Sequence, residues 1–180
     1  MPFFSKYNIL QDSENEMRIR ELMEDNTDYE HQNRETLKQT GFWGTQGAGC
    51  LIFCKENGKF LFPKRSVAVE QPGTYGTWGG AIDGNISPED AVKQEVHEEA
   101  GYNGNMKLIP LFIFKKDNFR YYNFLAIVDN VFTPKLNWET ESTVWTTLDN
   151  LPEPLHFGVK GVLNDPKSYE ILKKVQEAYS

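Results

Sequence analysis

Three glutamates at helical spacing are the residues of this chain best suited to chemistry. Glu95, Glu98 and Glu99 lie three and four residues apart, so on a helix their carboxylates share one face. Like charges at this spacing repel one another, and the helix dipole disfavours anions in the last turn. A solvated helix face is the ordinary explanation, but such a face would more naturally include lysine. Clustered carboxylate oxygens are what a hard cation such as Mg²⁺ requires, so we predict that these glutamates bind a metal ion.

The helix that carries the glutamates is marked at both ends. Ser87 can cap its start and Pro88 suits the first helical position. Gly101 supplies the left-handed residue that ends many helices. The sequence therefore predicts a helix over residues 88–100. Its glutamates fall beside an apolar stripe formed by Val92, Val96 and Ala100.

This stretch resembles the signature of the Nudix hydrolases. The family pattern is a glycine, five residues, a glutamate, seven residues, and then Arg-Glu-apolar-x-Glu-Glu-x-Gly-apolar. Gly80 opens the match here, and the segment from Gln94 to Tyr102 closes it. Two positions depart from the pattern, since Ile86 replaces the loop glutamate and Gln94 replaces the arginine. Losing both charges together leaves neither of them unpaired, which is compatible with a repacked, active site and also with a reduced or altered activity.

The resemblance implies a Mg²⁺-dependent hydrolase, with Mn²⁺ as a substitute. Water would attack a diphosphate in a nucleoside diphosphate derivative or a (deoxy)nucleoside triphosphate. By position, Glu95, Glu98 and Glu99 would be the metal ligands, and Glu95 and Glu98 would also be catalytic. Related hydrolases often carry a further glutamate before a later strand, where this chain has Glu139 and Glu141. Either fits, with an exposed loop as the alternative, and we take Glu139 as the catalytic candidate.

Substrate contacts are predicted at Lys64, Arg65, Trp78 and Gly80. Lys64 and Arg65 end a predicted strand, and a cation there can neutralise phosphate charge, although exposed strand-end cations are common. The ring of Trp78 can stack on a base, as can other aromatic rings nearby, although such rings are more often core. The other aromatic candidates are Tyr75, Tyr122 and Phe124. His156 is expected to be a hydrogen-bonded structural residue, with substrate contact as the alternative.

The order of predicted elements favours an α/β fold. Strands are expected over 48–54, 60–65, 108–114, 120–128 and 144–148, with a hairpin turn at Asn57-Gly58 and a final helix that starts at Asp165-Pro166. Mixed strands with a helix between them and another at the end suit a layered domain. The resemblance makes this a Nudix-like α/β/α sandwich with a mixed sheet, over residues 41–180.

Residues 1–40 form a separate, polar N-terminal extension. Ser13 to Glu16 and Thr27 to Glu30 read as helix starts, but the apolar stripes that follow are thin. Such helices need support from the main domain or from a second copy of the chain. A homodimer is therefore one of the two arrangements that we consider.

The composition limits the partners and the cellular compartment that we expect for the protein. The chain has 180 residues, 39% of them hydrophobic, and a formal net charge of −7, which disfavours nonspecific binding to nucleic acid or to anionic membranes. No apolar run reaches membrane-spanning length, and the first residues lack the apolar core of a signal peptide. Cys50 and Cys54 share one predicted strand, too far apart to bridge each other. We expect reduced thiols in a cytoplasmic protein.

Two rival functions remain open from the sequence. The first is a nucleotide-binding module that kept the fold and lost activity, which Ile86 and Gln94 motivate. The second is an isomerase similar to the Nudix-like isopentenyl diphosphate isomerases. Those enzymes use a cysteine near the segment that is Thr77 to Ala81 here, and this segment has none. Its absence counts strongly against isomerisation.

Overall fold

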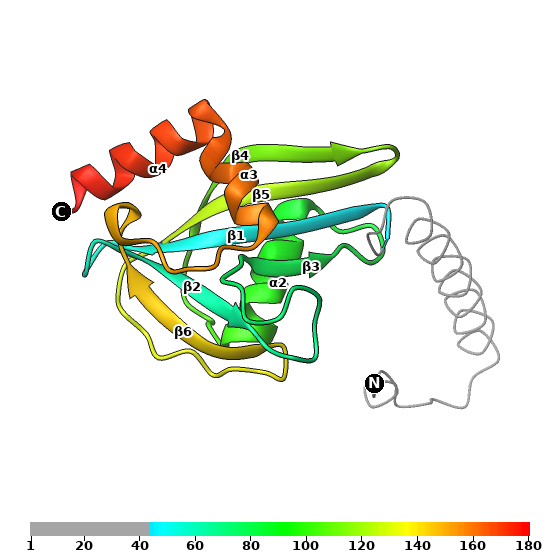
Figure 1. Ribbon diagram of the computed structural model, residues 1–180, viewed down its shortest axis with the longest axis horizontal. Helices are drawn as coiled ribbons and strands as arrows, with labels where there is room; N and C mark the ends of the chain where they lie inside the picture. The colour runs from blue at the N-terminus through cyan, green and yellow to red at the C-terminus, as the bar shows by residue number, and fades with distance from the viewer. Residues whose placement is uncertain (1–43) are drawn as a thin grey trace, which may run out of the picture.

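The computed structural model describes residues 44–180, which form a mixed β-sheet with helices on both faces (Figure 1). The strands are β1 Gln46–Cys54, β2 Lys59–Arg65, β3 Trp78–Ala81, β4 Lys107–Lys116, β5 Phe119–Val128 and β6 Thr140–Thr146. Their order across the sheet is β4-β5-β1-β2-β6, and β3 pairs with β1 beside β2. The helices predicted within residues 1–40, and the start of the domain at residue 41, lie outside the described residues.

The central strand β1 organises the sheet. It runs parallel to β5 over its whole length, from Gln46 opposite Arg120 to Cys54 opposite Val128, and antiparallel to β2 and β3. Every residue of β1 after Gln46 is buried, as expected for a strand whose two faces are both covered. Cys50 and Cys54 are free and buried within it, in agreement with the sequence.

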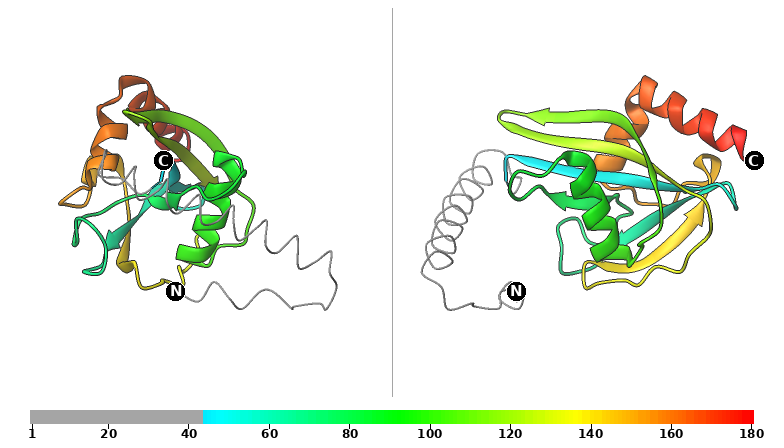
Figure 2. Two further views of the ribbon diagram at one scale, coloured as in Figure 1. Left: turned by 90° about the vertical axis from the view of Figure 1, so that its right-hand side faces the viewer. Right: turned by 180° about the vertical axis from the view of Figure 1, so that it is seen from behind.

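Helices cover the two faces separately, as the side view in Figure 2 shows. Helix α2, Pro88–Ala100, packs against β1 and β3, and its apolar residues join one core. Helices α3, Phe157–Asn164, and α4, Pro166–Ala178, pack on the opposite face against β4. The predicted α/β/α sandwich is therefore confirmed.

Both predicted ends of α2 are confirmed. The backbone N–H of Asp90 donates to the Ser87 hydroxyl at 3.1 Å, and Pro88 takes the first helical position. At the other end Gly101 has a φ of 66°, and its N–H donates to the carbonyl of His97. The helix is thus fixed at both ends, and its glutamates have defined positions.

Two other boundaries differ from the prediction. Strand β6 begins at Thr140, not Val144, because it stays paired with β2 through polar residues as far as Arg65. Leu148 lies in the short helix η1, Leu148–Asn150, and not in the strand. Helix α3 was not predicted, since Gly158 and Gly161 weaken its helical pattern.

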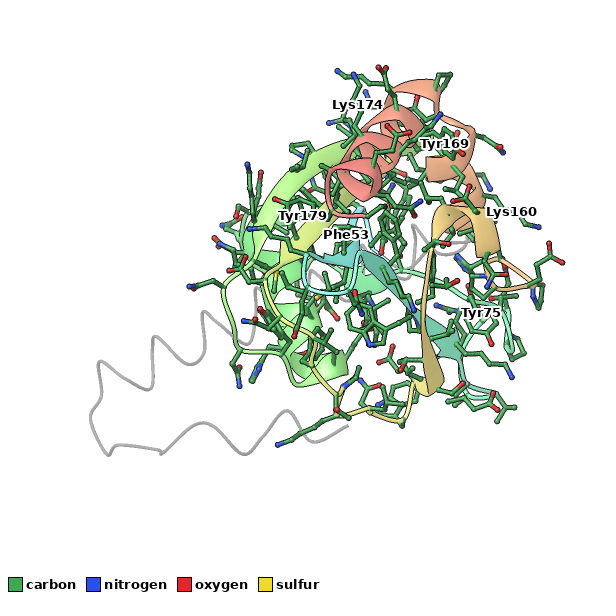
Figure 3. The ribbon with its side chains drawn as sticks, turned by 90° about the vertical axis from the view of Figure 1, so that its left-hand side faces the viewer. Phe53, Tyr75, Lys160, Tyr169, Lys174 and Tyr179 are labelled. Carbon is green, nitrogen blue, oxygen red and sulfur yellow. The ribbon has the colours of Figure 1, made fainter. Side chains whose placement is uncertain are left out.

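The C-terminal end of α4 reaches the hairpin between β1 and β2. Phe53 and Tyr179, labelled in Figure 3, have ring centroids 6.0 Å apart. This contact fastens the last helix over the sheet, at the end of β1 away from β3. Among the described residues, the helices are too short or too polar to cross a membrane.

Candidate active site

The three glutamates of helix α2 differ in how deeply they are buried. Glu98 is exposed, Glu95 is half-buried, and Glu99 retains 7% of its surface. The burial differs because helix α2 packs on β3 along one edge of its apolar stripe, and the three glutamates lie at different distances from that edge. The predicted position of the carboxylates beside the packed face is therefore what the structure shows.

Glu99 is held by the backbone of β3. The N–H of Gly79 donates to Oε2 of Glu99 at 3.0 Å. Burial raises the pKa of Glu99 well above its ordinary value, and the nearby Glu95 and Glu139 raise it further. The Gly79 N–H and the charge of Arg65 oppose this rise. The backbone of β3 thus orients the buried carboxylate of Glu99, which has acidic neighbours.

Glu95 lies against Gly80 of the same strand. A Cβ at Gly80 would come within 2.9 Å of Oε1 of Glu95, so a side chain there would push the carboxylate out of its position. Burial, followed by the charges of Glu98, Glu139 and Asp83, raises the pKa of Glu95 to about 7. Gly80, predicted to contact substrate, is therefore placed directly beside this carboxylate.

The two candidates for a distal carboxylate are separated by the structure. Glu139 is half-buried, and its burial raises its pKa; the charge of Arg65 lowers that pKa and the charge of Glu98 raises it. Glu141 lies on β6, where Lys64 approaches it to 3.6 Å in an exposed ion pair. Only Glu139 acts on both Glu95 and Glu99, so it is the one brought to the cluster.

Arg65 is the cation of this region. Its Nε donates to the carbonyl of Glu70 at 2.6 Å, and its charge acts on Glu99, Glu139 and His156. Lys64, the other predicted phosphate contact, is turned to Glu141 instead. Of the two cations, the structure thus places Arg65 with the carboxylates.

The predicted substrate contact at Trp78 needs correction. The side chain is fully buried, and its indole N–H donates to the carbonyl of Leu61 at 3.0 Å. No ring face is left for a base, so Trp78 belongs to the core. Phe124 is also buried there, and Tyr122 packs against the same core.

His156 has the structural role that the sequence favoured. Its Nδ1 accepts the backbone N–H of Gly158 at 3.1 Å and so caps the start of α3. Burial, with the charge of Arg65, lowers the pKa of His156 to about 4. The ring is therefore neutral at physiological pH, with its proton on Nε2.

Tyr121 is a residue of the site region that we did not predict. Its ring lies over Gly47 and Gly49 of β1, where a Cβ at either glycine would come within 2.6 Å of it. Thr77 hydrogen-bonds the phenol, and burial raises the pKa of that phenol. The pairing of a tyrosine with glycines on the next strand is invisible until the register of β5 on β1 is known.

The candidate ligands are of the chemical type that a hard divalent cation binds. Every candidate ligand is a carboxylate. Burial, followed by the charges of acidic neighbours, raises the pKa of Glu95 and Glu99, and a bound cation would favour their charged forms. Within residues 44–180, however, no three acidic, histidine or cysteine side chains are already gathered closely enough to hold an ion. Binding would therefore require the glutamate side chains to change rotamer.

Comparison with known proteins settles the family. A family model described as the NUDIX domain matches residues 44–165. The chain belongs to the Nudix family. This family assignment makes it a hydrolase of the Nudix type, as the sequence predicted.

Solved structures of Nudix proteins share its fold. A Nudix hydrolase from M. smegmatis, RenU, is 22% identical, with a TM-score of 0.60, and the match covers 77% of this chain and 90% of that one. A MutT protein from Methanosarcina mazei Go1 is 21% identical, with a TM-score of 0.57 and coverages of 72% and 92%. An Ap4A hydrolase from C. elegans is 18% identical, with a TM-score of 0.52 and coverages of 74% and 96%. No curated protein matches.

The two departures from the Nudix pattern are both on the surface. Ile86 is 40% exposed, and Gln94 is exposed on α2. The side-chain amide of Gln94 donates to Oε1 of Glu98 at 3.0 Å. The charged pair of the Nudix box is therefore not replaced by two buried side chains. Gln94 instead restrains one of the candidate ligands.

Proposed function

We propose that this Nudix protein is a Mg²⁺-dependent hydrolase of a diphosphate linkage, acting on a nucleoside diphosphate derivative or a (deoxy)nucleoside triphosphate. The observation that carries the proposal is the placement of the Glu95 and Glu99 carboxylates against Gly80 and Gly79 of β3, with Glu139 and Arg65 near enough for their charges to act on Glu99. Acidic groups held together at a partly buried site suit a cation, and the adjacent guanidinium suits phosphate.

Each residue has a role in this proposal. Glu95, Glu98 and Glu99 hold the ion through carboxylate oxygens, and Arg65 binds the diphosphate. A bound Mg²⁺ polarises the phosphoryl group and lowers the pKa of water. Glu139 would take the proton from the attacking water as the water oxygen bonds to phosphorus, while the bridging P–O bond breaks and its electron pair leaves with the released phosphate or nucleotide. Its half-buried position and raised pKa suit a base better than a fully solvated carboxylate would.

A binding module without turnover is the second candidate. It is favoured by Gln94, whose hydrogen bond to Glu98 occupies an oxygen that the ion would need. Isomerisation is disfavoured, because β3 and its approach offer no cysteine, and Cys50 is buried. Mn²⁺ as a substitute ion, a cytoplasmic location and homodimerisation remain predictions from the sequence.

A substrate panel tests the proposal. Purified protein with Mg²⁺ is expected to release nucleotide and phosphate products from at least one nucleoside diphosphate derivative or triphosphate. Excess EDTA should abolish this turnover, and added Mg²⁺ should restore it. Turnover that persists in EDTA would exclude a metal role, and no turnover on a broad panel would favour the binding module.

Restoring the family charges separates the two candidates further. Because Ile86 and Gln94 are both exposed, Ile86→Glu and Gln94→Arg should each change the free energy of unfolding by less than about 1 kcal/mol. In an active wild type the double variant should alter turnover only modestly, since the site already works. A silent wild type that gains turnover in the double variant would show that the natural site has degenerated.

A further inference from the structure

Two exposed apolar side chains stand out on the surface. Among the described residues, Val67 and Trp138 are the most exposed of the large hydrophobic residues, at 91% and 65%. They come from distant parts of the chain, the loop between β2 and β3 and the segment before β6. Single exposed apolar side chains are ordinary, whereas exposed apolar side chains that lie together often mark a binding surface.

One serine joins the two segments. The Ser66 hydroxyl donates to the carbonyl of Trp138 at 2.8 Å, and the Ser66 N–H donates to the carbonyl of Glu139 at 2.8 Å. The Ser66 oxygen also accepts the N–H of Ala68 at 3.2 Å, which fixes the start of the loop. Figure 1 shows this loop running beside the start of β6. The backbones that carry Val67 and Trp138 therefore lie side by side.

Their sequence neighbours are the polar groups of the candidate site. Ser66 follows Arg65 directly, and Trp138 precedes Glu139. Arg65 acts electrostatically on Glu139, and the hydrogen bonds of Ser66 hold the backbone segments of Val67 and Trp138 directly beside these two residues. A ligand with its phosphates at Arg65 would bring the group attached to those phosphates to Val67 and Trp138.

We propose that Val67 and Trp138 bind the nucleobase of the substrate, and that this pair sets which nucleotides the protein accepts. The inference rests on the proposed function for the location of the diphosphate. An indole face stacks on any base, and a branched apolar side chain excludes water from the other side of the contact. The charges beside the pair point to a phosphorylated ligand, which a nucleotide supplies together with a planar ring.

The chemistry of the pair predicts a type of specificity. Neither side chain can accept a hydrogen bond, and the indole N–H is the single polar group that they offer. The pair then does not recognise the hydrogen-bonding edge of a base. Affinity should depend on the area of the ring that stacks. Purine nucleotides should bind more tightly than pyrimidine nucleotides, while adenine and guanine should differ little.

Two nonhydrolysable probes test this inference, one that carries a nucleoside on its diphosphonate and one that lacks it. They are α,β-methylene ADP and methylenediphosphonate, titrated calorimetrically with Mg²⁺ present. Trp138→Ala should weaken the nucleotide by about tenfold or more, while the diphosphonate is unaffected. Trp138→Phe should retain most of the affinity, because the ring face remains. Val131→Ala is the matched control, since Val131 is 45% exposed on a loop anchored to Glu56.

The remaining outcomes overturn the inference. These are equal weakening of both probes by Trp138→Ala, no weakening of either, and a wild type that binds the two probes alike. A change in oligomeric state with unchanged nucleotide affinity would show that Trp138 contacts another copy of the chain. The binding assay needs no turnover, so a protein that discriminates the probes but fails the hydrolysis panel refutes the proposed function alone.

Discussion

Glu95→Gln is expected to stabilise the metal-free protein at neutral pH and to abolish most of its turnover. The pKa of Glu95 is raised to about 7, first by burial and then by acidic neighbours. Folding therefore forces this carboxylate into an unfavourable charged state above that pH. Glutamine keeps the shape without the charge, and the gain should approach about 3 kcal/mol, as a shift from 4.5 to about 7 implies. Turnover should fall by at least about 100-fold, because a ligand is lost.

The stability gained by Glu95→Gln should depend on pH in a defined direction. A carboxyl whose pKa is raised by folding destabilises the native state above its folded pKa and not below its unfolded one. The advantage of Glu95→Gln should therefore be absent near pH 4.5 and should grow until about pH 7. Urea unfolding in EDTA across this range measures it.

Glu98→Gln is the matched control on the same helix. Glu98 is exposed, so its charge is solvated and its removal should change metal-free stability little. If Glu95→Gln lowers stability in EDTA, Glu95 makes a structural contact and is misassigned as a ligand.

Gly79→Ala should unfold much of the protein or cost more than about 3 kcal/mol. An added Cβ would lie 2.2 Å from the carbonyl oxygen of Ala48 and 2.4 Å from Cα of Gly49. Both are backbone atoms of the central strand, which cannot move without breaking the pairing of β1 with β3. The same shift would withdraw the Gly79 N–H from Glu99.

Gly73→Ala separates this clash from backbone strain. Gly73 has a φ of +75°, and a Cβ there would meet nothing within 4 Å, so the loss should be only the 1–2 kcal/mol or so of a left-handed alanine. Equal urea midpoints for the two variants would contradict the steric explanation. A correctly folded Gly79→Ala protein would do so as well.

Local signals were the part of the structure that the sequence predicted well. The ends of α2 depend on Ser87, Pro88 and Gly101, whose effects act within a few residues, and they fall where expected. The glutamates of the site follow, since their spacing on a helix decides their common face. The buried strand β1 was equally clear from its unbroken apolar run.

Choices that depend on tertiary pairing were not predictable. Glu139 and Glu141 look alike in sequence, and only the placement of Lys64 beside Glu141 and of Arg65 beside Glu139 tells them apart. Trp78 is buried because β3 joins β1, and Tyr121 meets its glycines because β5 does. None of these partners lies near its counterpart in the chain.

The hydrogen bonds of Ser66 have a consequence for how this protein could be altered. Glu95 and Glu99 belong to a helix anchored in the core, whereas the side chains of Val67 and Trp138 are exposed and belong to neither core cluster. Surface loops tolerate exchange and lengthening at small thermodynamic cost. Because Ser66 ties the two segments together, ligand preference could be changed by exchanging residues 66–73 together with Trp138, while Glu139 and the glutamates of α2 are kept.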